Sequence, residues 1–292
     1  MPQPHRPSWR PVLRRGADLR WLTARSWTNR WYPQGVDTGV LQGRRMLAIS
    51  WFRQDRTRTH LASRVSFIDL ARPRRFDVAL AIEGEGGTLE PARIHVGGLA
   101  WFGDRLFAAA TKQGIWEFDL AGIRSVRGAV ARRLTGGARS RTLVAVRTRV
   151  HAVDLRCSFI GRVFDDHGRP LHRVLIGEFR SKDAGRIGEF DLTSDGFSPR
   201  RMLEPGLRHM QGAVGWGEEI FVSQSDGLRA GTLWRGTGDG LQGASLPLPA
   251  GCQDLALDAD DRVLWSLGEH PWRRVVHGIR FAELGIAHGR RT

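Results

Sequence analysis

The stretch HVGGLAWFGDRLFAAATKQGIWEFDL, residues 95–120, reads as three apolar strands joined by short turns. The first two strands meet at Gly103 and Asp104, and the third follows a glycine and closes on Phe118, Asp119 and Leu120. Apolar runs separated by glycine and aspartate are typical of antiparallel hairpins. The stretch therefore predicts a three-stranded antiparallel unit, and the fold depends on whether the chain repeats it.

The unit recurs along the chain in degenerate form. Its closing strand is the clearest echo, because SFIDL at 66–70, WEFDL at 116–120 and GEFDL at 188–192 share one pattern. A looser stretch follows the third strand, as at 74–82 or 243–250, and can supply a fourth, outer strand. Four-stranded units in series are the sequence pattern of a β-propeller. The further copies occupy residues 36–70, 161–192, 212–236 and 255–281.

We therefore predict an all-β chain folded as a five-bladed β-propeller with four-stranded antiparallel blades, spanning residues 31–285. An N-terminal arm, 1–30, and a C-terminal tail, 286–292, flank it. Little apolar sequence follows the last unit, so DLRWLTARSW, residues 18–27, is predicted to supply its outer strand. No long segment has a helical period. A two-domain β-sandwich is the structural alternative, because short, evenly spaced strands suit that fold as well.

The composition is strongly basic. A formal net charge of +15 over 292 residues is a value that by itself suggests a nucleic-acid partner. Lys112 and Lys182 are the only lysines, however, and the many arginines are scattered rather than grouped in long runs. We therefore expect a small-molecule substrate, anionic or aromatic in character, rather than nucleic acid.

The chain shows neither a signal-peptide stretch nor an apolar run of membrane-spanning length. The sequence therefore predicts a soluble, cytoplasmic protein without a membrane partner. Cys157 and Cys252 are the only cysteines and do not make a disulfide framework. Two buried thiols are the expectation for them.

Four segments carry a resemblance to other proteins: WYPQGV (31–36), HVGGLAWFGDRLF (95–107), MQGAV (210–214) and QDLALDADDRVLWSLGEHPWRRVV (253–276). They are similar to a group of actinobacterial proteins, many labelled only as secreted, with related YPQG, HAGGL, MQGA and EDL-to-LWSLTEYPGKR segments. The resemblance spans most of residues 31–281 and implies a five-bladed propeller without supplying an activity. This chain departs from the pattern at Gln253, where the group has Glu, at His270, where it has Tyr, and in lacking a secretion signal. These departures favour a specialised intracellular role.

The first strand of every propeller blade lines the central channel, so the residues that begin these strands are expected to converge. Polar residues begin them here, although a buried polar group costs free energy unless it finds a partner. Such residues can also simply join neighbouring blades by hydrogen bonds around ordered water. The polar residues at these positions are Gln34, His95, Ser158, His209, Gln211, Gln253 and Asp254.

An imidazole beside a carboxylate is the minimum equipment for proton transfer near neutral pH. His95 is the predicted acid or base, and Asp254, Glu178 and Glu269 are its candidate carboxylate partners. Side chains predicted to bind the substrate are Gln34, Gln211, Gln253, His209, Trp101 and Trp272.

No metal-ligand spacing and no cofactor motif is present, so the prediction is an enzyme without a cofactor. A divalent ion such as Ca²⁺ or Mg²⁺, held by histidine with Asp254 or Glu178, is the alternative. The chemistry favoured is non-redox, of the lyase, cyclase, isomerase or hydrolase type, in small-molecule metabolism. The alternative function is a lectin-like propeller that binds glycans or anions without catalysis, through surface tryptophan and arginine.

Overall fold

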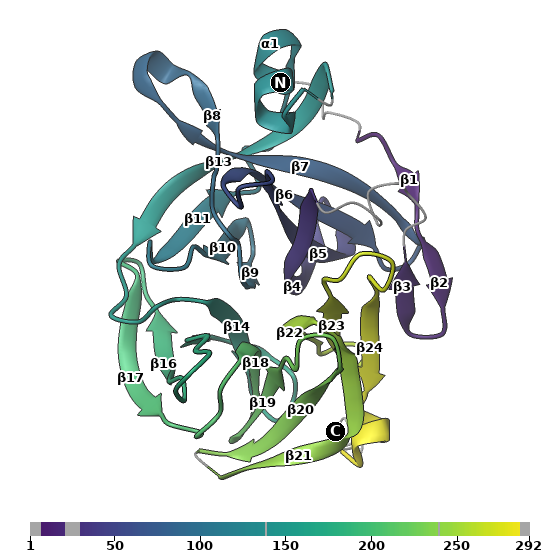
Figure 1. The fold of residues 1–292 in the computed structure, drawn as a ribbon, viewed down its shortest axis with the longest axis vertical. Coiled ribbons are helices and arrows are strands. Elements are labelled where there is room, and N and C mark those ends of the chain that lie inside the picture. Colours follow the sequence, from purple (N-terminus) through teal and green to yellow (C-terminus); the bar gives the residue numbers. More distant parts are fainter. Residues whose placement is uncertain (1–6, 21–29, 138, 239, 287–292) are drawn as a thin grey trace.

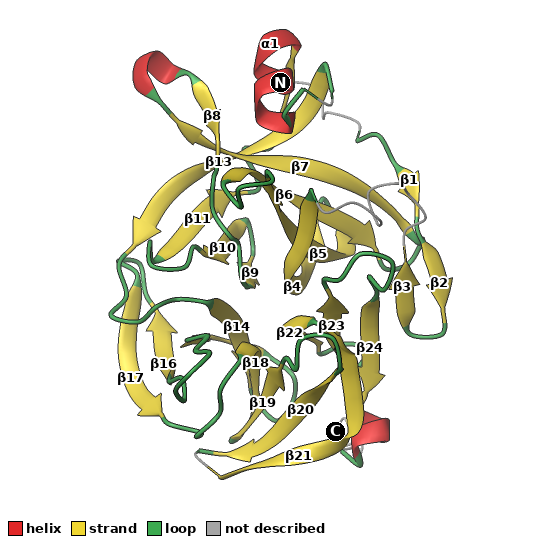
Figure 2. Ribbon diagram, in the orientation of Figure 1, coloured by secondary structure: helices red, strands yellow, loops and turns green. Residues whose placement is uncertain are grey.

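A computed structural model of the chain describes residues 7–20, 30–137, 139–238 and 240–286, and most of these lie in β-strands (Figure 2). The prediction of an all-β chain is confirmed. Strands form where valine, isoleucine and aromatic residues cluster, because these side chains pack well on a pleated surface. β5 (Arg44–Gln54) illustrates this, since its central residues from Met46 to Phe52 are all buried.

Consecutive strands pair antiparallel in runs that follow the chain, so each run is a small sheet built from local sequence. The first run comprises β4 (Trp31–Leu41), β5, β6 (His60–Asp69) and β7 (Arg74–Glu83). The next comprises β9 (Leu99–Phe102), β10 (Arg105–Ala109), β11 (Ile115–Asp119) and β13 (Arg141–His151). It is followed by β14 (Phe159–Phe164), β15 (Pro170–Gly177), β16 (Ile187–Leu192) and β17 (Phe197–Leu203). Then come β18 (Met210–Trp216), β19 (Glu219–Gln224), β20 (Ala230–Thr237) and β21 (Gly240–Ala250), and finally β22 (Cys252–Asp258), β23 (Val263–Gly268) and β24 (Val276–Arg280).

The runs are arranged around a common axis, with their first strands nearest the centre (Figure 1). β4 contacts β9, β9 contacts β14, β14 contacts β18, β18 contacts β22, and β22 returns to β4. This closed series of inner strands gives the molecule a propeller-type architecture. The predicted closing strands SFIDL, WEFDL and GEFDL lie on β6, β11 and β16, each the third strand of its run.

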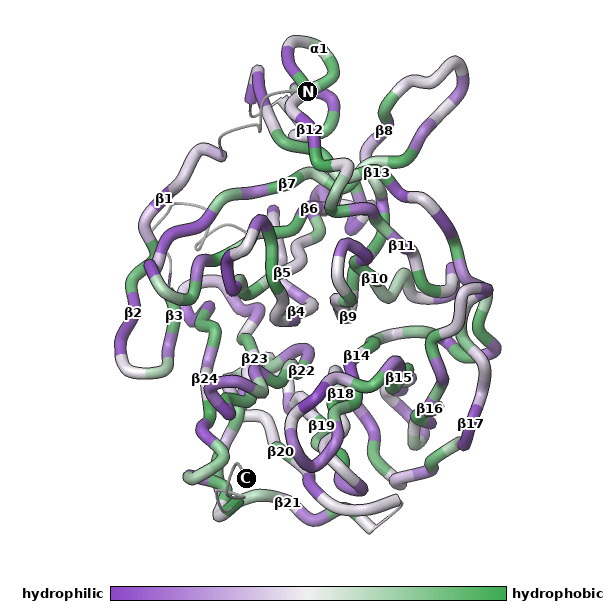
Figure 3. Tube along the Cα trace, turned by 180° about the vertical axis from the view of Figure 1, so that it is seen from behind, coloured by the Kyte–Doolittle hydropathy of each residue, from purple (hydrophilic) through white to green (hydrophobic). Residues whose placement is uncertain are grey.

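The core lies between neighbouring runs, where the side chains of one sheet pack on the next. Both faces of β5 are covered, because Met46 and Ala48 belong to one core cluster and Leu47 and Ile49 to another. Figure 3 shows hydrophobic residues on strands throughout the ring. Phe67 of β6, Trp101 of β9 and Phe118 of β11 share one such cluster. The packing around Trp101 is tight: a Cβ atom added to Gly39 would lie 2.3 Å from the Trp101 ring. Trp101 is therefore a core residue, which corrects its prediction as a substrate-binding side chain.

The N-terminal segment completes the last run. β1 (Arg10–Pro11) pairs with β7, β2 (Leu13–Arg15) pairs with β3 (Asp18–Arg20), and β3 pairs with β24 through Leu19 and Val276. Asp18 Oδ1 also lies 2.7 Å from His277 Nδ1 of β24. The pairing thus falls at the start of the predicted closing segment 18–27, whose residues 21–27 lie outside the described part of the chain.

Elements not predicted from the sequence join the first two runs at the rim of the molecule. Their outer strands, β7 and β13, pair in parallel over Val78–Ala81 and Leu143–Val146. β8 (Leu89–Pro91), β12 (Arg124–Arg127) and the helix α1 (Gly128–Thr135) cover this joint. The helix buries only Ala131 and Leu134, too few residues for a recognisable helical period. Short 3-10 turns, η2 (Glu85–Gly87) and η3 (Phe281–Leu284), complete the described elements.

Among the helices of the described residues, none has the length and apolar character needed to cross a lipid bilayer.

Candidate functional site

A cavity of about 500 Å³ lies where the inner strands begin. Gln34 reaches it from β4, Gln211 from β18 and Gln253 from β22, while His95 and Ser158 reach it just ahead of β9 and β14. Each inner strand thus contributes a polar side chain to one cavity. Glu269, which follows β23, also lines it. The structure therefore brings together Gln34, His95, Ser158, Gln211, Gln253 and Glu269 from the set considered in the sequence.

A repeated backbone feature places these side chains. Several inner strands are entered through a residue in the left-handed region: Val96 (φ 58°), Cys157 (φ 48°), His209 (φ 56°) and Gly251 (φ 62°). This conformation is an outlier for a β-branched residue and costs on the order of 1–3 kcal/mol. The surrounding structure holds Val96, whose carbonyl accepts a hydrogen bond from Ser50 Oγ at 2.8 Å. Because His95 precedes Val96 and Arg156 precedes Cys157, these bends set both side chains at the mouth.

His95 sits in an aromatic environment. Its ring lies 4.5 Å from the Phe52 ring and 5.5 Å from the His60 ring, measured between centroids. Tyr32 in turn stacks on Phe52, with 5.3 Å between the ring centroids. Burial, and secondarily the charge of His60, lowers the pKa of His95 to about 4. Burial also lowers the pKa of His60. The imidazole of His95 is therefore neutral near neutral pH.

The pKa of Glu269 is shifted in the direction opposite to that of His95, because the neutral form of a carboxyl group is the protonated one. Burial raises its pKa, although a hydrogen bond from Gln34 and the charges of His270 and Arg274 act against this. The Gln34 Nε2 atom donates to Glu269 Oε2 at 2.9 Å and to the carbonyl of Pro33, also at 2.9 Å. Arg274 Nε donates to the Glu269 carbonyl oxygen at 2.8 Å, so the segment is held on both sides. A carboxyl whose pKa is moved toward neutrality is suited to exchanging a proton.

Two further polar residues, Arg156 and Ser158, line the cavity from the segment before β14. Within the described ranges, their buried atoms Arg156 Nε and Ser158 Oγ have no hydrogen-bond partner. Leaving such an atom unpaired costs about 1–3 kcal/mol. Arg156 and His60 were not predicted from the sequence. Arg156 belongs to a loop, and His60 begins a third strand rather than a first strand, so neither occupies the repeated position.

Asp254 lies beneath the cavity and does not line it, which corrects its predicted place at the mouth. Its carboxyl group is fully buried, and Oδ2 accepts hydrogen bonds from the backbone N–H groups of Val36 at 3.0 Å and Leu99 at 3.1 Å. Burial raises its pKa well above the usual aspartate value. Successive residues of a strand point to opposite sides, so Gln253 can reach the cavity while Asp254 holds β4 and β9.

Glu178 also lies outside the cavity wall. Burial alone would raise its pKa, but hydrogen bonds from Arg186 and Arg180 outweigh burial and lower it to about 2. The ion pairs measure 3.2 Å to Arg186 and 2.9 Å to Arg180. Glu178 Oε1 also accepts a hydrogen bond from the backbone N–H of Arg156 at 3.4 Å. A carboxylate held ionised in this way is a support for Arg156 rather than a proton donor.

The remaining predicted substrate-binding residues lie apart from the cavity wall. The ring of His209 stacks on Phe179, which does line the cavity, at 5.6 Å. Trp272 is 72% exposed and is not among the lining residues. His209 therefore supports the wall from behind, and Trp272 belongs to the outer surface.

The two cysteines are buried and take no part in the cavity wall. Cys157 and Cys252 are free and buried, and burial raises the pKa of each thiol to about 12. Both therefore stay protonated and are poor nucleophiles. In the part of the chain that the structure describes, no group of three or more histidine, cysteine, aspartate or glutamate side chains could hold a metal ion.

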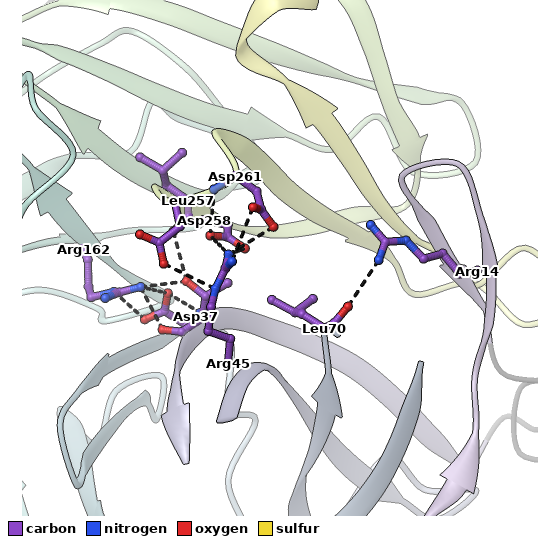
Figure 4. A network of polar contacts seen from close by, with 10 residues as sticks. Arg14, Asp37, Arg45, Leu70, Arg162, Leu257, Asp258 and Asp261 are labelled. Carbon is purple, nitrogen blue, oxygen red and sulfur yellow. Dashed lines mark hydrogen bonds and ion pairs between the residues drawn. The ribbon is translucent and has the colours of Figure 1, made fainter. Parts of the chain in front are cut away.

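Further along the inner strands, charged side chains join β14 to β4 and β5 to β22 (Figure 4). Arg162 of β14 donates to Asp37 Oδ1 at 2.8 Å and to the Thr38 carbonyl at 2.9 Å. Asp37 Oδ2 also accepts a hydrogen bond from the backbone N–H of Trp101 at 2.7 Å. Beyond it, Arg45 binds Asp258 at 2.6 Å. Charged side chains here pair with one another, in contrast to the mostly uncharged wall of the cavity.

Comparisons with known proteins leave the family open. No protein-family profile matches the chain, and no curated protein matches it. Among solved structures, a glutaminyl cyclase from Myxococcus xanthus is 12% identical, with 86% of this chain and 94% of that chain covered and a TM-score of 0.44. The gluconolactonase XC5397 from Xanthomonas campestris is 14% identical, with 94% and 86% covered and a TM-score of 0.45. A GH43_1 enzyme from Xanthomonas citri is 11% identical, with 88% and 91% covered and a TM-score of 0.45. These likenesses are too distant to assign a site or a substrate.

Proposed function

We propose that the chain is a five-bladed β-propeller enzyme that transfers protons to and from a small polar molecule bound at the mouth of its inner ring. Each antiparallel run is one blade in this proposal, and β3 supplies the outer strand of the last blade. The observation that carries the proposal is the meeting of His95 and Glu269, from distant parts of the chain, in one cavity lined by amide side chains.

Glu269 is assigned the role of general base. Its raised pKa brings proton uptake closer to the working pH than an ordinary glutamate allows, and Gln34 fixes the carboxylate by a hydrogen bond of 2.9 Å. His95 is assigned the role of a neutral hydrogen-bonding partner to the oxygen or nitrogen on which charge develops. A neutral imidazole can act in this way because it both donates and accepts hydrogen bonds.

The other lining residues favour an oxygen-rich or nitrogen-rich substrate. Gln211 and Gln253 offer amide donors and acceptors, while the side chains of Arg156 and Ser158 add donors suited to a carbonyl or carboxylate oxygen. The cavity volume of about 500 Å³ falls within the range of small-molecule sites. Hydrolase, cyclase, lyase and isomerase reactions all fit this equipment.

The test compares the wild type with Glu269→Gln and His95→Gln on a panel of small substrates: aldonolactones, aryl glycosides and glutaminyl dipeptides. We expect wild-type turnover of one class, a loss of about 100-fold or more in Glu269→Gln, and a smaller loss in His95→Gln. Thermal melting should stay close to that of the wild type. Glu218→Gln, an exposed residue at the turn between β18 and β19, is the matched control and should keep full activity.

A pH profile distinguishes the assigned base from a residue that only shapes the cavity. Because the base must be ionised, kcat/KM should rise with pH through a pKa above the usual glutamate value of 4.5. His95, with a pKa of about 4, should add no further step above pH 5. Unchanged turnover in Glu269→Gln would refute the proposal. Glycan binding without turnover by the wild type would favour the lectin-like alternative instead.

A further inference from the structure

A second cavity, of about 570 Å³, lies on the outer strands of the molecule. It is found where β1, β7, β12 and β13 come together, next to the parallel joint between the first two blades. None of the residues that line it also lines the central cavity. It is thus a separate place in the fold, and it does not depend on the proposed enzymatic function.

One carboxylate, Asp77, lines the cavity and binds three arginines, of which only Arg139 is among the lining residues. Asp77 binds Arg75 at 2.5 Å, Arg139 at 3.1 Å and Arg64 at 3.5 Å, and it also accepts a hydrogen bond from Ser66 Oγ at 2.7 Å. Arg75 is almost fully buried, with 1% of its surface exposed. Three guanidinium groups thus gather on one carboxylate in a largely buried place.

Two more arginines contribute positive charge to the cavity wall. Arg10 lines the cavity and makes no ion pair with any acidic side chain in the described ranges, and burial followed by the charge of Arg139 lowers its pKa. Arg141 lines the same cavity and donates through Nε to the hydroxyl of Ser125 at 3.1 Å, rather than to a carboxylate. Asp77 is the only acidic residue among the described residues that line the cavity.

Hydroxyl groups stand beside these arginines. Ser8, Ser125, Ser140 and Thr142 line the cavity, with Phe76 and Leu143 as its apolar contribution. Guanidinium groups bind phosphate through paired, charge-assisted hydrogen bonds, and hydroxyls complete such sites. We propose that this cavity binds the phosphoryl group of a small organic phosphate, with the organic part against Phe76 and Leu143.

The experiment measures binding of inorganic pyrophosphate to the full chain by isothermal titration calorimetry, at an ionic strength held constant with chloride. We expect saturable binding that raises the melting temperature. Arg10→Gln and Arg139→Gln should each weaken it by about 10-fold to 100-fold, as expected for loss of a hydrogen bond between charged groups. Arg141→Gln, at a more exposed position, tests the same site with less risk to folding.

Two control variants locate the binding. Arg229→Gln removes one exposed positive charge from the distant β19–β20 turn and should leave pyrophosphate affinity unchanged. Arg156→Gln removes the arginine of the central cavity and should also leave it unchanged. The proposal is overturned by an absence of saturable binding, by equal weakening in Arg229→Gln, or by loss of binding in Arg156→Gln only. Citrate binding as tight as that of pyrophosphate would overturn the assignment to phosphate.

Discussion

Asp254 shows how a single buried side chain can organise the site without touching the cavity. The side chain is fully buried, and its carboxyl group accepts hydrogen bonds from the backbone N–H groups of Val36 and Leu99, which belong to two neighbouring inner strands. Because Gln34 lies two residues before Val36, and His95 lies four before Leu99, this carboxyl fixes the strands that carry both. We infer that its role is positional.

Two substitutions of Asp254 should separate the contribution of its hydrogen bonds to the free energy of unfolding from the contribution of its titration. Asp254→Asn keeps an acceptor for both N–H groups, whereas Asp254→Leu leaves two buried donors unpaired and should lower the free energy of unfolding by about 2–6 kcal/mol. The raised pKa means that the folded chain holds the proton more tightly than the unfolded chain. The contribution of Asp254 to the free energy of unfolding of the wild type therefore falls as the pH rises above 3.8, the ordinary pKa of an aspartate.

The Asp254→Asn variant lacks this titration, so its stability relative to the wild type should increase from about pH 4 to about pH 8. Denaturant unfolding at several pH values measures the difference. A stability difference that does not change with pH would contradict the inference that Asp254 is buried with a raised pKa.

Sequence reasoning reached most of the site through the equivalent positions of the repeat, and it reached Glu269 as a carboxylate able to approach the same mouth. Gln34, Gln211 and Gln253 stand at or near the starts of first strands, so the repeat itself predicted their convergence. It could not distinguish Gln253 from Asp254, because strand alternation turns one into the cavity and the other beneath it. Arg156 comes from a loop outside the pattern, so only the folded arrangement shows that it belongs to the site.

At the scale of elements, the closing strand β3 joins the two ends of the described chain. Leu19 of β3 is 2% exposed and packs in a cluster with Trp265 and Val276 of the last run. Without β3, the backbone groups of β24 that it pairs would be exposed as a sheet edge, which favours aggregation. The short strand therefore protects an edge as well as adding a core residue.

Leu19→Ala should lower the free energy of unfolding by about 2–5 kcal/mol, because it removes a buried leucine from this cluster. Leu13→Ala, at a position 51% exposed on the adjacent β2, is the control and should have little effect. Deleting residues 1–20 should produce aggregates on size-exclusion chromatography. A monomeric, fully stable deletion variant would show that the closing strand is dispensable.

The sequence allowed the strand order within each run to be predicted because local patterns determine it. The third strands β6, β11 and β16 were recognisable from their shared endings, and β7 and β21 from the looser stretches that follow. The parallel pairing of β7 with β13 is different, since it joins residues about 65 positions apart and has no local signal. The phosphoryl-site proposal depends on that joint, which explains why sequence reasoning did not reach it.

For the whole molecule, the network around Asp37 connects inner strands that are distant in sequence. Asp37 lies on β4, forms an ion pair with Arg162 of β14, and accepts a hydrogen bond from the backbone N–H of Trp101 on β9 (Figure 4). Thr38 Oγ1 donates a hydrogen bond to the Leu257 carbonyl of β22 at 3.1 Å. The Arg162 side chain is almost completely buried. A buried ion pair of this kind contributes little compared with a well-packed apolar pair, but removing one partner leaves a buried charge.

Arg162→Met should therefore lower the free energy of unfolding by about 3–5 kcal/mol near neutral pH. Burial already raises the pKa of Asp37 even with Arg162 present, so removing the arginine should raise it further. Protonation then neutralises the carboxyl group, so the loss of unfolding free energy should be smaller near pH 4 than near pH 7.

The double variant Arg162→Met with Asp37→Asn should recover part of the stability. Its amide oxygen still accepts the hydrogen bond from the backbone N–H of Trp101 and carries no charge. Arg169→Met, which breaks the exposed pair with Asp165, should change little. If the cost of Arg162→Met proved equally small, the inner ring would not depend on this network, and the packing between neighbouring runs would be enough to hold it closed.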